Sequence, residues 1–332
     1  MTLLLNRSDL ERHLDPAAII AALRAGFTAE PGETAARRVV SALPGPGTAT
    51  ALIPGLVAGV PAYTVKVNAK FPASRPALRG VVCLHDLETG ELLALLDSAT
   101  VTAWRTGLAA ALGTAVLARR GGGQVAVIGA GAQSDLVLRG LGALRDAPAA
   151  GGPELTGTGL GITGLTVTDL DADRAAAFAE RHGERLGVPA GIAVDARAAA
   201  EDADIVITAT WARRPLLHAA DIAPGTHLTA LGADERGKSE LAPDLLERAR
   251  VVVDDLPLAV EMGVLATAGL SVGDAAGTLG DLLRGEVPGR VRDEEVTVYA
   301  PVGLPWQDLA LSWAAYQAAR AARVGTSFDF LG

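Results

Sequence analysis

The sequence predicts an α/β protein in which a doubly wound parallel sheet is inserted into a smaller α+β domain. Three observations support this fold class. A glycine-rich turn at residues 129–131 lies between a β-type run and a helix-type run. Apolar strand-like runs then alternate with helix-like runs as far as residue 254. Residues 39–96, by contrast, contain short β-type runs separated by proline and glycine.

The N-terminal region is expected to begin with helices and to continue as a small antiparallel sheet. Ser8 followed by Glu11 is typical of a helix start, and apolar residues recur at helical spacing as far as Phe27. The β-type runs that follow are residues 49–53, 62–67, 80–84 and 92–96. Residues 86–90 are typical of a hairpin turn between the last two runs.

Two longer helices are predicted outside the parallel sheet. Residues 101–117 are rich in alanine and leucine and place Arg105 in the first turn of their helix. Because the helix dipole disfavours a cation there, Arg105 either faces solvent or serves an anion that shares the site. Residues 304–323 predict an amphipathic helix near the C-terminal end.

The glycine-rich turn follows an apolar run at residues 124–128 that is typical of a strand buried on both faces. Gly129 and Gly131 let the backbone turn sharply and approach a pyrophosphate closely. A helix that starts near Ala132 offers free N–H groups and the positive end of its dipole to that anion. Ser134 stands where the third glycine of a G-x-G-x-x-G fingerprint would be.

The next predicted strand, residues 165–169, ends in Asp169, an acid suited to hold a ribose 2′-OH. A Gly/Thr/Pro-rich insert at residues 151–164, whose own role the sequence does not reveal, accounts for the long spacing from Gly129. A carboxylate here favours NAD over NADP, since it repels a 2′-phosphate and Leu170 supplies no cation. The alternative is an ordinary glycine turn of an α/β protein.

A helix at residues 172–185 and strands at residues 204–210, 226–231 and 250–254 continue the alternation. In doubly wound sheets, ligands bind beyond the carboxyl ends of the strands. Thr208, Thr210 and Asp234 lie at such ends and are candidate site residues. Asp234 could instead be a simple turn residue after its strand.

Composition excludes several classes of protein. A net charge of -9 and a pI near 5.1, without a basic stripe, argue against a nucleic-acid partner. The single Cys83 excludes an internal disulfide, and the scattered histidines give no metal-ligand spacing. No apolar run resembles a signal peptide or is long enough to cross a bilayer. We therefore expect a cytoplasmic protein with no metal and no membrane partner.

With these residues in view, the sequence resembles the ornithine cyclodeaminase and μ-crystallin family over nearly the whole chain. The motifs that carry the resemblance are residues 80–90, 102–107, 129–133, 203–210 and 230–241, of which the last is the most specific. The resemblance implies a substrate-binding and dimerisation domain made of residues 1–118 and 305–332. A Rossmann-type NAD-binding domain at residues 119–304 would be inserted in it, and the protein would be a homodimer.

The resemblance also implies roles for single residues. The basic groups that hold a substrate α-carboxylate match Arg38, Lys66 and Arg105, and the catalytic residues match Asp234 and Lys66. The cofactor contacts match Gln133 and Asp169, which join Gly129, Gly131, Ala132, Thr208 and Thr210 as candidate NAD-binding residues. Arg37 could take the place of Arg38, and Lys66 could instead lie on the solvent face of an edge strand.

The function implied is NAD-dependent hydride chemistry at the α-carbon of a small L-amino acid, with an imine intermediate. In the cyclodeaminase version the product is a cyclic imino acid such as proline and the cofactor is not consumed. The alternatives are an amino-acid dehydrogenase of the alanine type or a cyclic ketimine reductase, in which NAD(H) turns over.

A different class, a binding protein like μ-crystallin, is less favoured because that type has serine at the place of Asp234. Three departures weaken the ornithine assignment in particular. Residues 77–80 stand where ornithine-acting members have a contacting threonine, the loop at residues 72–76 is short, and residues 301–305 differ from the usual pattern.

Overall fold

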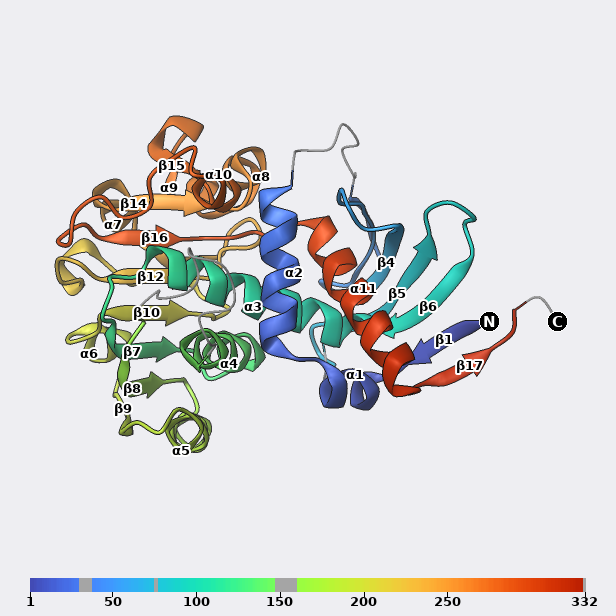
Figure 1. The fold of residues 1–332 in the computed structure, drawn as a ribbon. Coiled ribbons are helices and arrows are strands. Elements are labelled where there is room, and N and C mark those ends of the chain that lie inside the picture. The colour runs from blue at the N-terminus through green and yellow to red at the C-terminus, as the bar shows by residue number, and fades with distance from the viewer. Residues whose placement is uncertain (30–37, 75–76, 147–159, 331–332) are drawn as a thin grey trace. The chain divides into compact units, whose positions relative to one another are not determined.

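The computed structural model describes residues 1–29, 38–74, 77–146 and 160–330 (Figure 1). The chain divides into two compact units. Unit 1 comprises Met1–Thr106 and Leu304–Gly332, and unit 2 comprises Gly107–Gly303. The sequence places the first boundary after residue 118, whereas the contacts divide the chain within helix α3 (Ser98–Leu117), because the second half of this helix packs into the core of unit 2.

Unit 1 is built on a seven-stranded sheet with the order β17-β1-β6-β5-β4-β3-β2. The strands are β1 (Thr2–Leu5), β2 (Val39–Ala42), β3 (Ala49–Gly55), β4 (Ala62–Lys70), β5 (Leu78–Asp86), β6 (Leu92–Asp97) and β17 (Thr326–Phe328). The sheet is mixed, since β1 pairs with β6 in parallel while the other pairs are antiparallel. The expectation of a small antiparallel sheet was therefore incomplete, because the strands at both ends of the chain were not recognised.

The helices of unit 1, besides the first half of α3, are α1 (Arg7–His13), α2 (Pro16–Thr28) and α11 (Pro305–Ala322). Helix α1 begins after Asn6 and not at Ser8. The side chain of Asn6 accepts a hydrogen bond from the N–H of Asp9, whose side chain accepts one from the N–H of Asn6. This capping box satisfies two backbone donors at the helix start, which explains the earlier boundary.

Helix α11 covers one face of the sheet at β3, β4 and β5 and packs along α2 (Figure 1). Trp306, near the start of α11, lies edge-to-face against Phe27 of α2 with ring centroids 4.8 Å apart. The same ring lies where a side chain at Gly26 would be, so only glycine fits there. The C-terminal helix thus completes the core that the N-terminal residues begin.

The other face of this sheet carries an exposed apolar row. Val39, Leu52, Val67 and Val81 are cross-strand partners on β2 to β5 and are 55%, 43%, 37% and 40% exposed. Because side chains alternate along a strand, Lys66 next to Val67 points to the opposite, buried face.

Unit 2 contains an eight-stranded parallel sheet with the order β15-β14-β16-β12-β10-β7-β8-β9, which Figure 1 shows as strands lying one below the other. Its strands are β7 (Gly123–Ile128), β8 (Ile162–Thr168), β9 (Ala190–Ile192), β10 (Ile205–Thr208), β12 (His227–Ala230), β14 (Arg250–Val253), β15 (Ala275–Thr278) and β16 (Thr297–Tyr299), and a small second sheet pairs β11 (Arg213–Leu217) with β13 (Ser239–Leu241). The helices are α4 (Ala132–Asp146), α5 (Ala172–Leu186), α6 (Ala196–Ala200), α7 (Pro243–Arg248), α8 (Leu256–Glu261), α9 (Val264–Ala268) and α10 (Leu279–Arg284).

Helices cover both faces of the eight-stranded sheet, which confirms the predicted doubly wound fold. Val125 and Val127 of β7 point into a core formed with α3, α4 and α5. Ala126 and Ile128 of the same strand point into a second core formed with α6, α7, α8 and α9. A strand buried on both faces needs apolar residues at consecutive positions, which is the pattern that the sequence shows.

The chain reverses its direction across the sheet between β7 and β10, which are neighbours. Strands β8 and β9 extend the sheet on one side of this point, and β12 and β16 extend it on the other. Ligands of doubly wound sheets bind at the carboxyl ends of the strands at such a point. The candidate cofactor residues lie there.

Candidate functional site

Lys66 occupies the buried face of β4, a strand with neighbours on both sides. Its side chain is only 2% exposed. The alternative of a lysine on the solvent face of an edge strand is therefore wrong. A buried ammonium is costly unless it is paired, so its partners decide its role.

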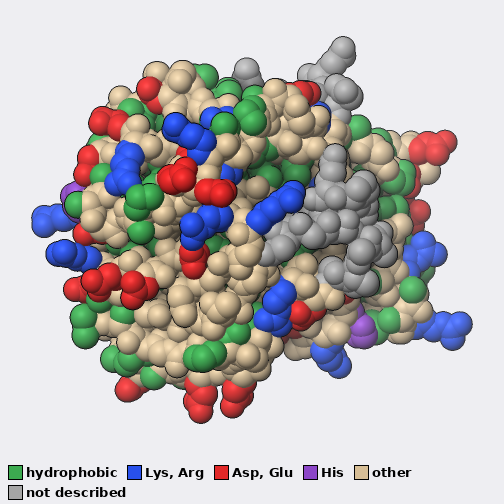
Figure 2. Space-filling view, turned by 60° about the vertical axis from the view of Figure 1, so that its left-hand side comes forward, with side chains coloured by type: hydrophobic (Ala, Val, Ile, Leu, Met, Phe, Trp, Pro, Cys, Tyr) green, Lys and Arg blue, Asp and Glu red, His purple; other side chains and the backbone are tan. Residues whose placement is uncertain are grey.

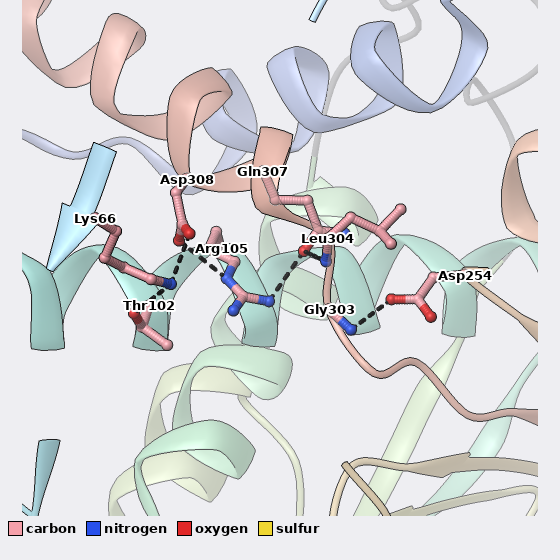
Figure 3. Close-up of polar contacts among 8 residues, drawn as sticks. All are labelled: Lys66, Thr102, Arg105, Asp254, Gly303, Leu304, Gln307 and Asp308. Atoms are coloured by element: carbon pink, nitrogen blue, oxygen red, sulfur yellow. Dashed lines mark hydrogen bonds and ion pairs between the residues drawn. The ribbon is translucent and has the colours of Figure 1, made fainter. Parts of the chain in front are cut away.

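Those partners come from α3 and α11 (Figure 3). The Lys66 Nζ lies 2.6 Å from one carboxylate oxygen of Asp308 and donates to the Thr102 hydroxyl at 3.3 Å. The Arg105 Nε donates to the other Asp308 oxygen at 3.3 Å, and its Nη1 donates to Gln307 Oε1 at 3.1 Å. Asp308 therefore bridges Lys66 and Arg105, which we call the cation pair.

Arg105 is the eighth residue of α3, in its second turn, so its expected place in the first turn is wrong. The helix starts earlier than the sequence suggests, at Ser98. The dipole argument consequently does not apply. Arg105 faces the unit 1 core because Asp308 and Gln307, both buried, hold its guanidinium there.

The pKa of Lys66 is lowered from 10.5 to about 8. Burial is the main cause, and the nearby positive charges of Arg105 and Arg38 act in the same direction, while the Asp308 carboxylate opposes them. Arg38, just before β2, is exposed, yet its charge reaches Lys66. The alternative candidate Arg37 lies outside the described residues.

The cation pair has hydrogen-bonding capacity left. An ammonium has three N–H donors and a guanidinium has five. Within the described parts of the chain, Lys66 uses two of its donors and Arg105 uses two. One N–H of Lys66 and three of Arg105 remain for a ligand, and a carboxylate is the anion that such donors hold well.

The glycine-rich turn of unit 2 has the expected form between β7 and α4. Gly129 has φ +98°, and a Cβ there would come within 2.7 Å of the Ala209 carbonyl oxygen. A Cβ at Gly131 would meet nothing within 4 Å, so the backbone is open to a ligand. Ser134 replaces the third glycine without disrupting the turn, because its buried hydroxyl donates to the Gly129 carbonyl at 2.6 Å.

Ala132 and Gln133 open helix α4, where the first N–H groups have no acceptor within the helix. The side-chain Oε1 of Gln133 is buried and has no hydrogen-bond partner among the described residues. A buried polar atom of this kind is costly unless a ligand or water reaches it. Open backbone, free N–H groups and this orphaned oxygen fit a dinucleotide at this turn.

Asp169 directly follows β8, as predicted. One carboxylate oxygen accepts the N–H of Ala130 at 2.7 Å, and the other accepts the N–H of Asp171 at 3.0 Å and a hydrogen bond from Arg174. Burial acts to raise the pKa of Asp169, but these hydrogen bonds outweigh it and lower the pKa. Arg174 supplies the cation that Leu170 does not, a neighbour that the sequence reasoning missed.

Thr208 and Thr210 meet a residue that the sequence reasoning did not assign, Glu240. The Glu240 carboxylate is fully buried and accepts both threonine hydroxyls at 2.7 Å, the Thr210 N–H at 2.7 Å and the Gly232 N–H at 2.6 Å. Burial raises the pKa of Glu240. This carboxylate ties the ends of β10 and β12 together, and its presence in the 230–241 motif was the signal that could have revealed it.

Asp234 lies in the loop that follows β12, and its side chain is 47% exposed. The Lys238 Nζ donates to its carboxylate at 2.8 Å. Lys238 itself is nearly buried and lies 4.5 Å from the centre of the exposed Trp211 ring. Asp234 is thus an accessible carboxylate at the strand ends of unit 2, held by a neighbouring cation.

Other expectations concern absences. Among the described residues, no three His, Cys, Asp or Glu side chains come together as metal ligands. No helix in the same part of the chain is long and apolar enough to cross a membrane. On the face shown in Figure 2, acidic and basic side chains are interspersed. Most of the 151–164 insert, and residues 75–76 of the short loop, lie outside the described residues.

Known proteins resemble this chain in sequence over most of its length. The Ornithine cyclodeaminase/mu-crystallin family model matches residues 2–323. The Delta(1)-pyrroline-2-carboxylate reductase of Bacillus cereus is 31% identical over 292 residues, covering 85% of this chain and 85% of that protein.

Two solved structures share the fold. An archaeal alanine dehydrogenase dimer with bound NAD has a TM-score of 0.86 and 27% identity, covering 99% of both chains. The Thermococcus litoralis Delta(1)-pyrroline-2-carboxylate reductase with NADH and L-proline has a TM-score of 0.85 and 26% identity, covering 98% of this chain and 100% of that one. Together with the family match over nearly the whole length, these likenesses identify the chain as a member of the ornithine cyclodeaminase/mu-crystallin family.

Proposed function

We propose that this chain is an enzyme of NAD-dependent hydride transfer at the α-carbon of a small L-amino acid or of the corresponding imine. The observation that carries the proposal is the buried cation pair with unused N–H donors. A surface arginine and lysine would be solvated, whereas Lys66 and Arg105 are held inside unit 1 by Asp308. Such an arrangement suits the α-carboxylate that every amino-acid substrate carries.

Unit 1 is accordingly the substrate-binding domain of the proposal. Lys66 and Arg105 would each donate to the carboxylate, and the exposed Arg38 would add its positive charge. Fixing the carboxylate orients the α-carbon, which contributes to catalysis by position alone. The ammonium of Lys66, with its lowered pKa, can also exchange a proton near neutral pH.

Unit 2 is the cofactor-binding domain of the proposal. NAD, when bound, supplies the hydride acceptor, and NADH supplies the donor. Gly129, Gly131 and Ala132 would hold the pyrophosphate, and Asp169 would hold the ribose hydroxyls. NAD or NADH is present in the two similar structures described above. Arg174 notwithstanding, the carboxylate at Asp169 favours NAD over NADP.

Asp234 is the proposed acid-base residue. Removal of hydride from an amine needs its nitrogen unprotonated, and an accessible carboxylate can take that proton and stabilise the developing iminium charge. In the reverse direction the same carboxyl group returns the proton. The accessible position of Asp234 at the strand ends supports this role, which a buried turn residue could not fill.

The relatives favour net turnover of NAD(H) over cyclodeamination. They include a pyrroline-2-carboxylate reductase and an alanine dehydrogenase, both named for a net redox reaction. We therefore place imine reduction or amino-acid dehydrogenation first and deaminating cyclisation second. A μ-crystallin-like binding protein is the outcome if no substrate is turned over.

The test is incubation of the protein with NADH and Δ¹-pyrroline-2-carboxylate, or with NAD and a panel of L-amino acids that includes alanine and ornithine. Product identity and net change in NADH are both followed. Reduction or dehydrogenation changes NADH in step with product, whereas cyclodeamination forms product at constant NADH. If none of these compounds reacts although NAD binds, the proposed enzymatic function is wrong. The hypothesis of a μ-crystallin-like binding protein is then favoured.

We further propose that the apolar row of unit 1 is the surface through which two copies form a homodimer. Exposed apolar side chains in register across four strands are typical of an interaction surface. Leu52→Glu should convert the dimer to monomer in light scattering, whereas Val194→Glu, at an exposed apolar position of unit 2, should not. A wild-type monomer, or a dimer that survives Leu52→Glu, would contradict the proposal.

A further inference from the structure

Asp308 is the shared counter-ion of the cation pair. Its two carboxylate oxygens are each engaged by a different cation, Lys66 at 2.6 Å and Arg105 at 3.3 Å. Both Lys66 and Asp308 are 2% exposed, and Arg105 is 11% exposed. Water is therefore nearly excluded from the pair, so the charges act on one another with little screening.

The same carboxylate determines the net charge that a ligand meets. Lys66 and Arg105 contribute two positive charges, and Asp308 removes one of them. Within hydrogen-bonding distance the cluster therefore carries one net positive charge, which a single carboxylate neutralises. Among the described residues, the exposed Arg38 is the further cation whose charge acts on Lys66. A second carboxylate on the ligand would therefore have Arg38 as its cationic partner.

Gln307, the neighbour of Asp308 on helix α11, is also held by hydrogen bonds. Gln307 Oε1 accepts from the Arg105 Nη1 and from the Leu304 N–H at the helix start (Figure 3). Arg105 is thus held at two nitrogen atoms by consecutive residues of one helix turn. Its remaining N–H donors keep a defined direction, which a freely rotating arginine would lack.

Resting on the function proposed above, we propose that Asp308 is the positioning residue of the carboxylate site. It fixes the Lys66 ammonium and the Arg105 guanidinium side by side, and it selects substrates with a single carboxylate over dicarboxylates. Asp308 contacts no substrate atom in this role. It acts through the two cations that it bridges.

A pH readout separates this role from a structural one. The groups that act on Lys66 are Asp308 from α11, Arg105 from α3 and Arg38 from the start of β2. Of these, only Asp308 favours the protonated ammonium, so its removal lowers the pKa of Lys66. Asp308→Asn keeps the size of the side chain and removes the charge, whereas Gln307→Ala removes a contact to Arg105 without changing any charge.

The experiment measures kcat/KM for reduction of Δ¹-pyrroline-2-carboxylate by NADH between pH 6 and 9 in wild type, Asp308→Asn and Gln307→Ala. In Asp308→Asn we expect the pH at which kcat/KM falls to move lower, with about a tenfold or greater loss at pH 8. In Gln307→Ala we expect a loss that is the same at every pH. Equal pH profiles in wild type and Asp308→Asn would overturn the proposal.

Substrate selection provides the second readout. The comparison is made at pH 6, the lowest pH of the series, where Lys66 is most fully protonated. At this pH, wild type should bind L-proline more tightly than L-aspartate as competitive inhibitors of the reduction, and Asp308→Asn should narrow that difference by about tenfold, since the site gains one net positive charge while Lys66 keeps its proton. An unchanged ratio would show that Asp308 does not set the charge preference. If wild type binds NADH but reduces no imine and binds neither amino acid, the proposed function itself has failed.

Asp308→Asn could prevent folding, because it leaves Lys66 buried beside Arg105. The double variant Lys66→Met with Asp308→Asn removes both the ammonium and its carboxylate partner. Circular dichroism and NADH binding report whether each protein folds. A double variant that folds where the single variant does not shows that Asp308 is needed to accommodate the ammonium, as proposed. If both fail to fold, Asp308 is a packing residue and the proposal is wrong.

Discussion

Replacement of Lys66 by Met should change how stability depends on pH. In the folded protein the pKa of Lys66 is about 8, against 10.5 in the unfolded chain. Between these two values the unfolded chain binds a proton at this site and the folded chain does not, so wild-type stability rises with pH across the window. The difference between the two pKa values corresponds to about 3 kcal/mol.

Lys66→Met abolishes this contribution. We expect the free energy of unfolding, from urea titrations at pH 7.5 to 10.5, to increase by about 3 kcal/mol more in wild type than in the variant. Lys70→Met, at a partly exposed position on the same strand, is the control and should follow wild type. A wild-type-minus-variant difference that stays constant over this pH range would show that Lys66 is not a costly buried charge, and the account of the cation pair would be refuted.

Four further predictions test the sites directly. Lys66→Ala or Arg105→Ala should lower kcat/KM, which corresponds to a loss of about 2 to 4 kcal/mol in transition-state stabilisation, and should leave NAD affinity nearly unchanged. A wild-type KM would exclude a substrate contact. Asp234→Asn should retain dinucleotide binding and lose about 10²-fold or more in kcat, and wild-type turnover would make it a turn residue. Glu240→Gln should destabilise the protein by about 1–3 kcal/mol in urea unfolding, because an amide group then faces the N–H of Thr210 or Gly232; an unchanged midpoint would contradict this. In wild type, kcat/KM for imine reduction should fall above about pH 8, as the Lys66 ammonium is lost.

The strands β7, β8, β10, β12 and β14 of unit 2 were predictable because their signals are local, whereas the short strands β9, β15 and β16 of the same sheet were not recognised. A strand buried on both faces requires consecutive apolar residues, and the turn at Gly129 requires a positive φ that favours glycine. The start of α4 follows from the same short stretch, and Asp169 follows from its place at the end of the next strand, β8. The sheet of unit 1 was predicted less completely, since β1 and β17 are short and pair with strands distant in the sequence.

The partners of the site residues could not be predicted in this way. The residues near Lys66 in the sequence do not predict its contact with Asp308, because the packing of α11 on β4 brings the two side chains together. Glu240 likewise lies 30 residues from Thr210, whose N–H and hydroxyl it accepts. Periodicity reveals which face of an element is buried, but it does not reveal which polar group of another element packs against that face.

The two-part construction of unit 1 has a consequence for how the protein folds during synthesis. Arg105 is separated from Asp308 by 203 residues, and the whole of unit 2, a continuous segment, is made in between. Unit 2 can fold as it leaves the ribosome, while β4 and α3 must wait for α11 before their buried cations find a counter-ion. A chain cut short before residue 305 would therefore retain the continuous segment of unit 2 but leave Lys66 and Arg105 without the Asp308 carboxylate. We expect unit 1 of such a chain to be degraded by proteases.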